Sequence, residues 1–332
     1  MAERAPPSAP ARAAAPPAWP IPWQEVSGDR DGALAWLEYA LVRAALGVAA
    51  RMPDAFQDRL AGTLARLARA LDRRRSDSAR AFIAQALGPA AGERRREELV
   101  LAAWRHLFLG TLRGAAFERR VDLDDLAAHC EIHVHPDFQR VIDEGRGALF
   151  VGAHVGAWEA VLALMPRLEF EPFYVVSRPP RNWPLSRYAQ AKRERLGVRL
   201  IPRHGAVEAM SEVLAAGGYV ALLLDQRARR RTVLAPFFGR LAHCERVPGV
   251  LARRLRVPIG FGACYETGRP FRYEMRLTRV VWPEEIEHAS PAEVAALVNG
   301  ELERMILARP EQYFWLHERY RKAPEPATKP AE

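Results

Sequence analysis

A short apolar run bounded by glycines, residues 148–151, is the feature that most constrains the fold of this chain. Gly147 and Gly152 flank the run, which predicts a buried strand. From Gly156 onward apolar residues recur at helical spacing, and Pro166 marks a stop. The sequence therefore predicts a strand of a parallel sheet that gives way to a helix, at the edge where α/β folds place their ligands.

The rest of the second half alternates strands with helices, the pattern of a mostly parallel central sheet flanked by helices. The other predicted strands are residues 130–135, 173–177, 198–201, 219–224, 258–264 and 271–280. The predicted helices between and after them are residues 185–196, 206–216, 247–255 and 291–308. The expected fold class is therefore α/β.

His154 lies at the first strand-to-helix junction, and Glu159 follows five positions later. In a continuous helix five positions correspond to about 500°, so the two side chains would not share a face. They can meet if the turn at Gly152 and Gly156 folds His154 back over the first helical turn. A neutral imidazole can take a proton from an alcohol, and a carboxylate behind it fixes the tautomer and stabilises the imidazolium. The pair is a candidate general-base dyad, with a surface or capping pair as the alternative.

The chain divides into four segments. Residues 1–30 are rich in Pro and Ala, with neither hydrophobic periodicity nor the arrangement of a signal peptide, and they predict a disordered tail. Residues 31–125 predict a helical region that faces a membrane, and residues 126–322 the α/β core. Residues 323–332 predict a second disordered tail.

Residues 33–50 form the most membrane-like stretch. The stretch is short for a spanning helix and carries Glu38 and Arg43, each of which costs roughly 2.5–3.5 kcal/mol at mid-bilayer. After Pro53 the pattern becomes that of a basic amphipathic helix. Two interpretations stay open: the helices pack on the core, or they form a platform on an anionic membrane surface, where each nearby Lys or Arg adds about 1 kcal/mol.

The charge is basic, with 49 Lys and Arg against 40 Asp and Glu, a net charge of +9. The arginine excess suits phosphate and carboxylate partners, although plain solubility would also explain it. Three scattered cysteines, Cys130, Cys244 and Cys264, are too few for a disulfide framework or a zinc knuckle and fit a reducing compartment. His129, His133 and His135 invite a metal site, but no ligand cluster follows at suitable spacing, so an exposed strand edge is favoured.

The stretch around His154 resembles the His-x4-Asp/Glu motif of glycerolipid acyltransferases, in the form of the lipid A biosynthesis (lauroyl/myristoyl) acyltransferase branch. That branch has Gly-His-Phe-Gly-Asn-Trp-Glu. This chain keeps His154, Gly156, Trp158 and Glu159, and departs from the branch at positions 153, 155 and 157, which are Ala, Val and Ala.

Further blocks resemble the same branch, in the same order, between about residues 33 and 322. Arg178 and Arg193 stand in segments similar to its Tyr-Arg-Pro and Arg-x-Arg-x-Gly. An apolar strand ends in Asp225 and Gln226, as does a family strand. The remaining matches are the Phe-Phe-Gly turn, which includes Phe238 and Gly239, and the closing segment 309–319, which we expect to close the sheet near the site.

The resemblance implies transfer of a fatty acyl chain from acyl carrier protein or coenzyme A to a hydroxyl of a membrane glycolipid, with a lipid A-type acceptor favoured. His154 would deprotonate the hydroxyl, Glu159 would polarise His154, and Arg178 and Arg193 would hold phosphate or the oxyanion. The implied substrate-binding residues also include Asp225, Gln226, Phe238 and Gly239. The chemistry calls for no metal or redox cofactor, and the expected location is the cytoplasmic face of an inner membrane.

Other functions stay open. The acceptor could be a phosphatidylinositol mannoside, an ornithine lipid or a polyene-type pigment. A non-catalytic lipid-binding scaffold would keep the basic helices but tolerate the loss of His154 and Glu159, and both are present. A nucleic-acid binder would explain the charge, but it should show a recognisable binding module or aromatic residues interleaved with the charge, and the sequence shows neither.

Overall fold

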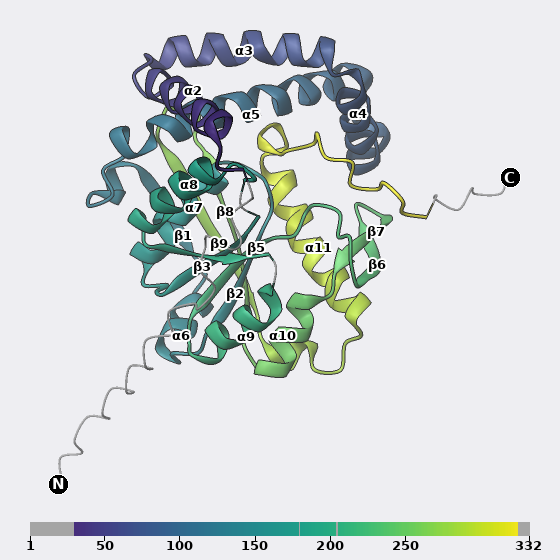
Figure 1. Ribbon diagram of the computed structural model, residues 1–332. Helices are drawn as coiled ribbons and strands as arrows, with labels where there is room; N and C mark the ends of the chain where they lie inside the picture. Colours follow the sequence, from purple (N-terminus) through teal and green to yellow (C-terminus); the bar gives the residue numbers. More distant parts are fainter. Residues whose placement is uncertain (1–29, 179, 204, 325–332) are drawn as a thin grey trace, which may run out of the picture.

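A computed structural model describes residues 30–178, 180–203 and 205–324, and its centre is a seven-stranded sheet in the order β1-β9-β8-β2-β5-β3-β4 (Figure 1). The strands are β1 (Cys130–Val134), β2 (Ala148–Gly152), β3 (Phe173–Ser177), β4 (Val198–Pro202), β5 (Tyr219–Leu223), β8 (Ile259–Glu266) and β9 (Tyr273–Val281). Strands β8, β2, β5, β3 and β4 run parallel, whereas β9 is antiparallel to β8 and β1 runs with β9. The predicted α/β class with a mostly parallel sheet is confirmed.

Helices cover both faces of this sheet. They are α6 (Asp137–Asp143), α7 (Trp158–Leu164), α8 (Trp183–Arg195), α9 (Ala206–Ala215), α10 (Val247–Leu255) and α11 (Pro291–Ala308). Leu149 and Val151 of β2 join the core formed with α9, α10 and α11, while Ala148 and Phe150 join the core formed with α6 and α7. Both faces of β2 are therefore buried, which explains why its sequence is continuously apolar rather than alternating.

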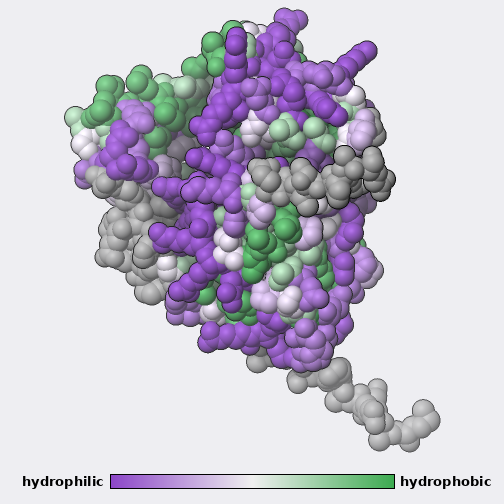
Figure 2. Space-filling view, turned by 90° about the vertical axis from the view of Figure 1, so that its right-hand side faces the viewer, coloured by the Kyte–Doolittle hydropathy of each residue, from purple (hydrophilic) through white to green (hydrophobic). Residues whose placement is uncertain are grey.

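The first four α-helices of the described residues lie across one end of the sheet, at the top of Figure 1. They are α2 (Ala33–Ala49), α3 (Asp54–Leu71), α4 (Arg73–Leu87) and α5 (Glu93–Arg120). No helix in the described ranges is long and apolar enough to cross a membrane. Helix α2 nevertheless buries only Ala35 and Ala49, and Figure 2 shows an apolar area at its upper left, where α2 lies after the turn from Figure 1.

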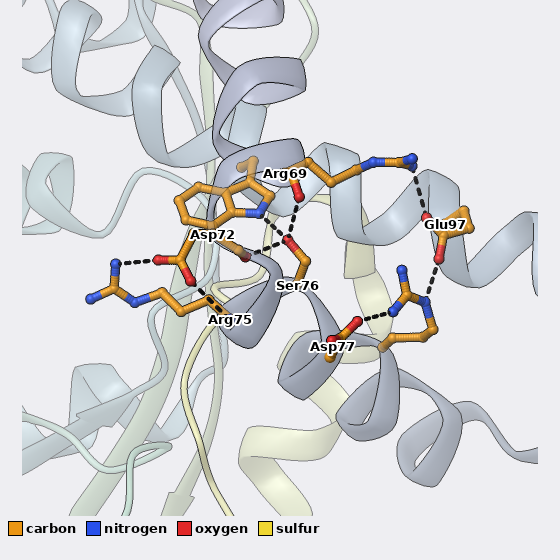
Figure 3. Close-up of polar contacts among 8 residues, drawn as sticks. Arg69, Asp72, Arg75, Ser76, Asp77 and Glu97 are labelled. Atoms are coloured by element: carbon orange, nitrogen blue, oxygen red, sulfur yellow. Dashed lines mark hydrogen bonds and ion pairs between the residues drawn. The ribbon is translucent and has the colours of Figure 1, made fainter.

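Polar contacts join α3, α4 and α5 (Figure 3). The carboxylate of Glu97 accepts hydrogen bonds from Arg69, at 2.8 Å, and from Arg80. The Ser76 hydroxyl donates to the Arg69 carbonyl at 3.2 Å and accepts from Trp104 Nε1 at 3.1 Å. Because both Ser76 and Trp104 are buried, this satisfied pair holds the three helices together at little cost in desolvation.

A separate hairpin, β6 (Thr232–Phe237) and β7 (Arg240–Glu245), was not predicted. The sequence indicated only its turn, where Phe238 and Gly239 have φ of 48° and 73°. Two consecutive positive φ values are those of the type I′ turn that matches the twist of a two-residue hairpin. Pro236 stands within β6, and a proline in a run argues against a central strand, so the sequence pattern concealed this edge pair.

The other predicted elements match the structure within one or two residues, and α10 and α11 match at both ends. Helix α11 begins cleanly because the Ser290 hydroxyl accepts from the Glu293 N–H at 3.2 Å while the Glu293 carboxylate accepts from the Ser290 N–H at 2.7 Å. The two tails predicted as disordered lie outside the described residues, apart from residues 30, 323 and 324.

Candidate active site

His154 and Asp225 follow two neighbouring strands, β2 and β5. Gly152 lies opposite Leu223 in the parallel register, so the chain leaves both strands at the same edge of the sheet. There His154 Nδ1 lies 2.8 Å from Asp225 Oδ1. The Asp225 side chain is 1% exposed and that of His154 23%. Because an ionised carboxylate only accepts, His154 carries its proton on Nδ1 and keeps Nε2 as the basic nitrogen.

Burial and charge set the ionisation of this pair. Burial lowers the pKa of His154, but the charge and hydrogen bond of Asp225, together with the charge of Glu159, outweigh it and raise the pKa above its ordinary value. Burial raises the pKa of Asp225, whereas His154 and the backbone N–H groups of residues 154 and 225 lower it below the ordinary value. The arrangement is therefore a buried carboxylate behind a strengthened imidazole base.

Backbone contacts hold the loop that carries His154. Gly156 has φ of +63°, and a Cβ there would lie 2.1 Å from the Cys264 carbonyl oxygen, which accepts a hydrogen bond from the Ala157 N–H at 2.7 Å. Only glycine fits such an approach. The closing segment also binds the loop, since the Phe314 N–H donates to the His154 carbonyl at 3.0 Å. The prediction that residues 309–319 close the sheet near the site is confirmed.

Glu159 does not occupy the position expected of it. Its side chain is 59% exposed, and its carboxylate pairs with Arg193 of α8, with Nη2 3.1 Å from Oε1. Helix α7 begins at Trp158, so Glu159 lies in its first turn, and no hydrogen bond joins Glu159 to His154 within the described ranges. The direct pairing of Glu159 with His154 is not confirmed, because Asp225 holds the hydrogen-bonded position.

The other predicted site residues lie at different distances from the His154–Asp225 pair. Gln226 stays with the pair, its Nε2 lying 3.5 Å from His154 Nδ1. Arg178 follows β3 and is exposed, without a hydrogen bond or ion pair to any described residue. Phe238 is buried in the hairpin turn, where its N–H donates to Glu303 Oε1 at 2.6 Å, and the neighbouring Gly239 is exposed. Substrate binding by Phe238 and Gly239 stays a prediction.

The family model of the bacterial lipid A biosynthesis acyltransferases matches residues 29–322. The chain belongs to this family. No curated protein matches the chain. Membership confirms the predicted family and makes the protein a lipid A-type acyltransferase, which requires an acyl donor and a lipid acceptor.

Tyr313 and His317 of this acyltransferase lie near the site but were not predicted as site residues. The Tyr313 hydroxyl and Asp225 Oδ2 are both buried without a hydrogen-bond partner in the described part of the chain. Burial and the charge of Asp225 raise the pKa of Tyr313 well above its ordinary value. His317 Nε2 accepts from the Arg227 N–H at 3.0 Å, and burial lowers the pKa of His317 to about 4. The closing segment was their only signal, and it predicted a structural role.

His133 of β1 and His135, which directly follows this strand, are both exposed. Strand β1 is at the edge of the sheet, and His133 Nε2 lies 3.0 Å from Glu131 and 3.7 Å from Glu274. Over the ranges that the structure describes, no group of three or more His, Cys, Asp or Glu could hold a metal ion. The exposed strand edge favoured by the sequence is what the structure shows.

Proposed function

We propose that this family member moves a fatty acyl chain from a thioester donor, acyl carrier protein or coenzyme A, to a hydroxyl of a membrane glycolipid. A lipid A-type acceptor is favoured by the family. The observation that carries the proposal is the 2.8 Å contact between His154 Nδ1 and the buried Asp225 carboxylate at the carboxyl edge of the sheet. This contact supports His154 Nε2 as the general base, with Asp225 holding the opposite nitrogen of the ring.

The reaction follows from this pair. His154 Nε2 takes the proton of the acceptor hydroxyl as its oxygen attacks the thioester carbonyl, and Asp225 stabilises the imidazolium. The tetrahedral intermediate then expels the thiolate, which receives the proton from the imidazolium. Arg178 has no partner among the described residues and is available to an acceptor phosphate or the oxyanion. Arg193 is the second candidate cation, and its positive charge is offset by its ion pair with Glu159.

Helix α2 supports a peripheral location on an anionic membrane. Its large apolar residues Leu34, Trp36, Leu37, Leu41 and Val48 are each at least half exposed. Aromatic rings lie beside them, with Tyr39 contacting Tyr188 of α8 and the Arg43 guanidinium 4.1 Å from the centre of the Tyr188 ring. Apolar side chains edged by aromatic and basic groups are typical of helices that lie in the membrane interface. We place this face on the cytoplasmic side of an inner membrane.

The transferase is tested by mass spectrometry of total lipids from cells that express the native chain or a variant. We expect one glycolipid to gain a single acyl chain with the native chain and with Glu208→Gln, a control that removes an exposed acid of α9. His154→Ala and Asp225→Asn should abolish the gain. An unchanged lipidome in the presence of folded native protein would contradict the proposal and favour the scaffold.

The membrane location is tested separately, by sedimentation with anionic vesicles. The native protein should sediment, and Leu37→Glu with Leu41→Glu should release it, because each buries a charge in the interface. Val207→Glu with Leu307→Glu, at exposed apolar positions of α9 and α11, is the control with the same change in charge and should sediment like the native protein. A native protein that stays in the supernatant refutes this location.

A further inference from the structure

The loop between β5 and β6 carries four arginines within the five positions 227–231, directly after Asp225 and Gln226. Arg229, Arg230 and Arg231 are exposed, and no carboxylate of the described chain pairs with them. Many arginines of the N-terminal helices, by contrast, have acidic partners: Arg69, Arg74, Arg75, Arg80, Arg94, Arg105, Arg113 and Arg120. The loop therefore presents a concentrated positive charge that an anionic partner would relieve.

The base of this loop is held in place. The Ala228 N–H donates to the His243 carbonyl of β7 at 3.2 Å, and the Arg227 side chain donates to the Arg321 carbonyl at 3.3 Å. Arg231 has φ of +47°, a left-handed conformation that costs energy for a residue with a side chain. The three exposed arginines thus stand on an ordered base, and less entropy is lost when a partner binds them.

Two exposed leucines lie on the hairpin that follows. Leu234 and Leu241 are 40% and 43% exposed. Leu234 pairs with His243 and Leu241 with Pro236, so the leucines are diagonal neighbours on one face of the hairpin. Figure 2 looks onto this side of the molecule and shows an apolar area in the middle of the view with hydrophilic side chains around it.

We infer that Arg229, Arg230, Arg231, Leu234 and Leu241, together called the arginine–leucine surface, dock the acidic carrier protein that brings the acyl thioester. The inference rests on the proposed function and names its donor. Exposed apolar residues edged by arginine are the composition of a protein–protein contact. Asp225 and Arg231 are six residues apart, at most about 20 Å along the chain. A thioester on a long flexible arm can therefore reach His154 from a carrier docked here.

A protein partner fits this surface better than a membrane or a free nucleotide. The hairpin lies at the right of Figure 1 and α2 at the upper left, so a membrane on the exposed face of α2 leaves the hairpin to a soluble partner. The phosphates of coenzyme A would pair with the arginines but would leave the two leucines without a role.

The test compares binding and turnover for the full-length chain and matched charge reversals. The test variant carries R229E, R230E and R231E. The control variant reverses three other exposed arginines without ion pairs in the described chain, R254E, R269E and R272E, so the net charge changes equally. The probe is acyl carrier protein loaded with a saturated acyl chain. We expect carrier affinity to fall, and KM for the loaded carrier to rise, by about tenfold or more in the test variant alone, with kcat kept.

Further arms separate the possible outcomes. A small uncharged acyl thioester of N-acetylcysteamine should serve the test variant as well as the native chain, because it needs no docking. Leu234→Asp should weaken carrier binding with all three arginines present. The inference is overturned by unchanged carrier binding, by an equal loss in the control, by a loss confined to vesicle sedimentation, or by a loss confined to acyl-coenzyme A. A native chain that binds the carrier but acylates no lipid would instead refute the proposed function.

Discussion

Replacing Asp225 by asparagine tests which carboxylate activates His154. The proposed mechanism assigns that role to Asp225, because its Oδ1 lies 2.8 Å from His154 Nδ1, whereas Glu159 pairs with Arg193. Asparagine keeps the size of the side chain, and its carbonyl oxygen can still accept from Nδ1. The new amide nitrogen takes the place of Oδ2, which is buried and has no hydrogen-bond partner within the described ranges. The substitution therefore removes mainly the buried charge.

The expected loss is large for Asp225→Asn and small for Glu159→Gln. General acid–base catalysis contributes about 10²–10⁴-fold, and replacing the aspartate behind the histidine by asparagine costs about 10⁴-fold in a serine-protease triad. We therefore expect kcat to fall by about 10²–10⁴-fold in Asp225→Asn, or roughly 3–5 kcal/mol of transition-state stabilisation. Glu159 is mostly exposed and paired, so water screens its charge, and its loss should cost less than about tenfold.

The assay is the pH dependence of kcat/KM for the native chain and both variants. In the proposed mechanism the base is neutral His154, so the rate should rise as pH rises through the pKa of His154, which lies above its ordinary value. In Asp225→Asn the charge that raises the pKa of His154 is removed while burial still lowers it, so the pKa of His154 falls. The acid limb of the pH profile then moves to lower pH, and the plateau of the profile is lower than that of the native chain. The reasoning is refuted if Glu159→Gln costs more than Asp225→Asn, or if the acid limb does not move in Asp225→Asn.

Three further predictions concern folding. Gly156→Ala places a methyl group 2.1 Å from the Cys264 carbonyl oxygen and should lower the midpoint of thermal unfolding far more than Gly239→Ala, whose methyl group meets nothing within 4 Å. Equal shifts in the two midpoints would contradict this prediction. Burial lowers the pKa of His317 to about 4, below its unfolded value of about 6.5, so this histidine adds stability above pH 6.5 and loses that contribution as pH falls toward 4. The free energy of unfolding of His317→Gln in urea should therefore depend less on pH between about 6.5 and 4, and a pH dependence equal to that of the native chain would contradict this prediction. Arg113→Met leaves the largely buried Glu266, whose carboxylate lies 2.6 Å from the Arg113 guanidinium, without this partner and should cost about 3–5 kcal/mol in urea unfolding; a neutral effect would show that water reaches the pair.

Local pattern was enough to place most of the elements. The glycine-bounded run 148–151 predicted β2, and Val247–Leu255 and Pro291–Ala308 were predicted with the ends that the structure shows. Such predictions succeed because strand burial, helix periodicity and capping depend on residues close in sequence. The hairpin was missed for the same kind of reason, since Pro236 breaks the local signature of a strand that only its partner stabilises.

The residue types of the site can be read from the sequence, which has a histidine at one strand end and an aspartate at another, with the family motifs around them. The contact between these two residues depends on the tertiary fold. His154 and Asp225 are 71 positions apart, and their contact depends on β2 and β5 being neighbours in the sheet although β3 and β4 come between them in the chain. Periodicity shows which side of an element is buried, whereas the order of strands follows from packing across the whole core. The sequence alone therefore favours Glu159, the nearer carboxylate in the chain, as the partner of His154.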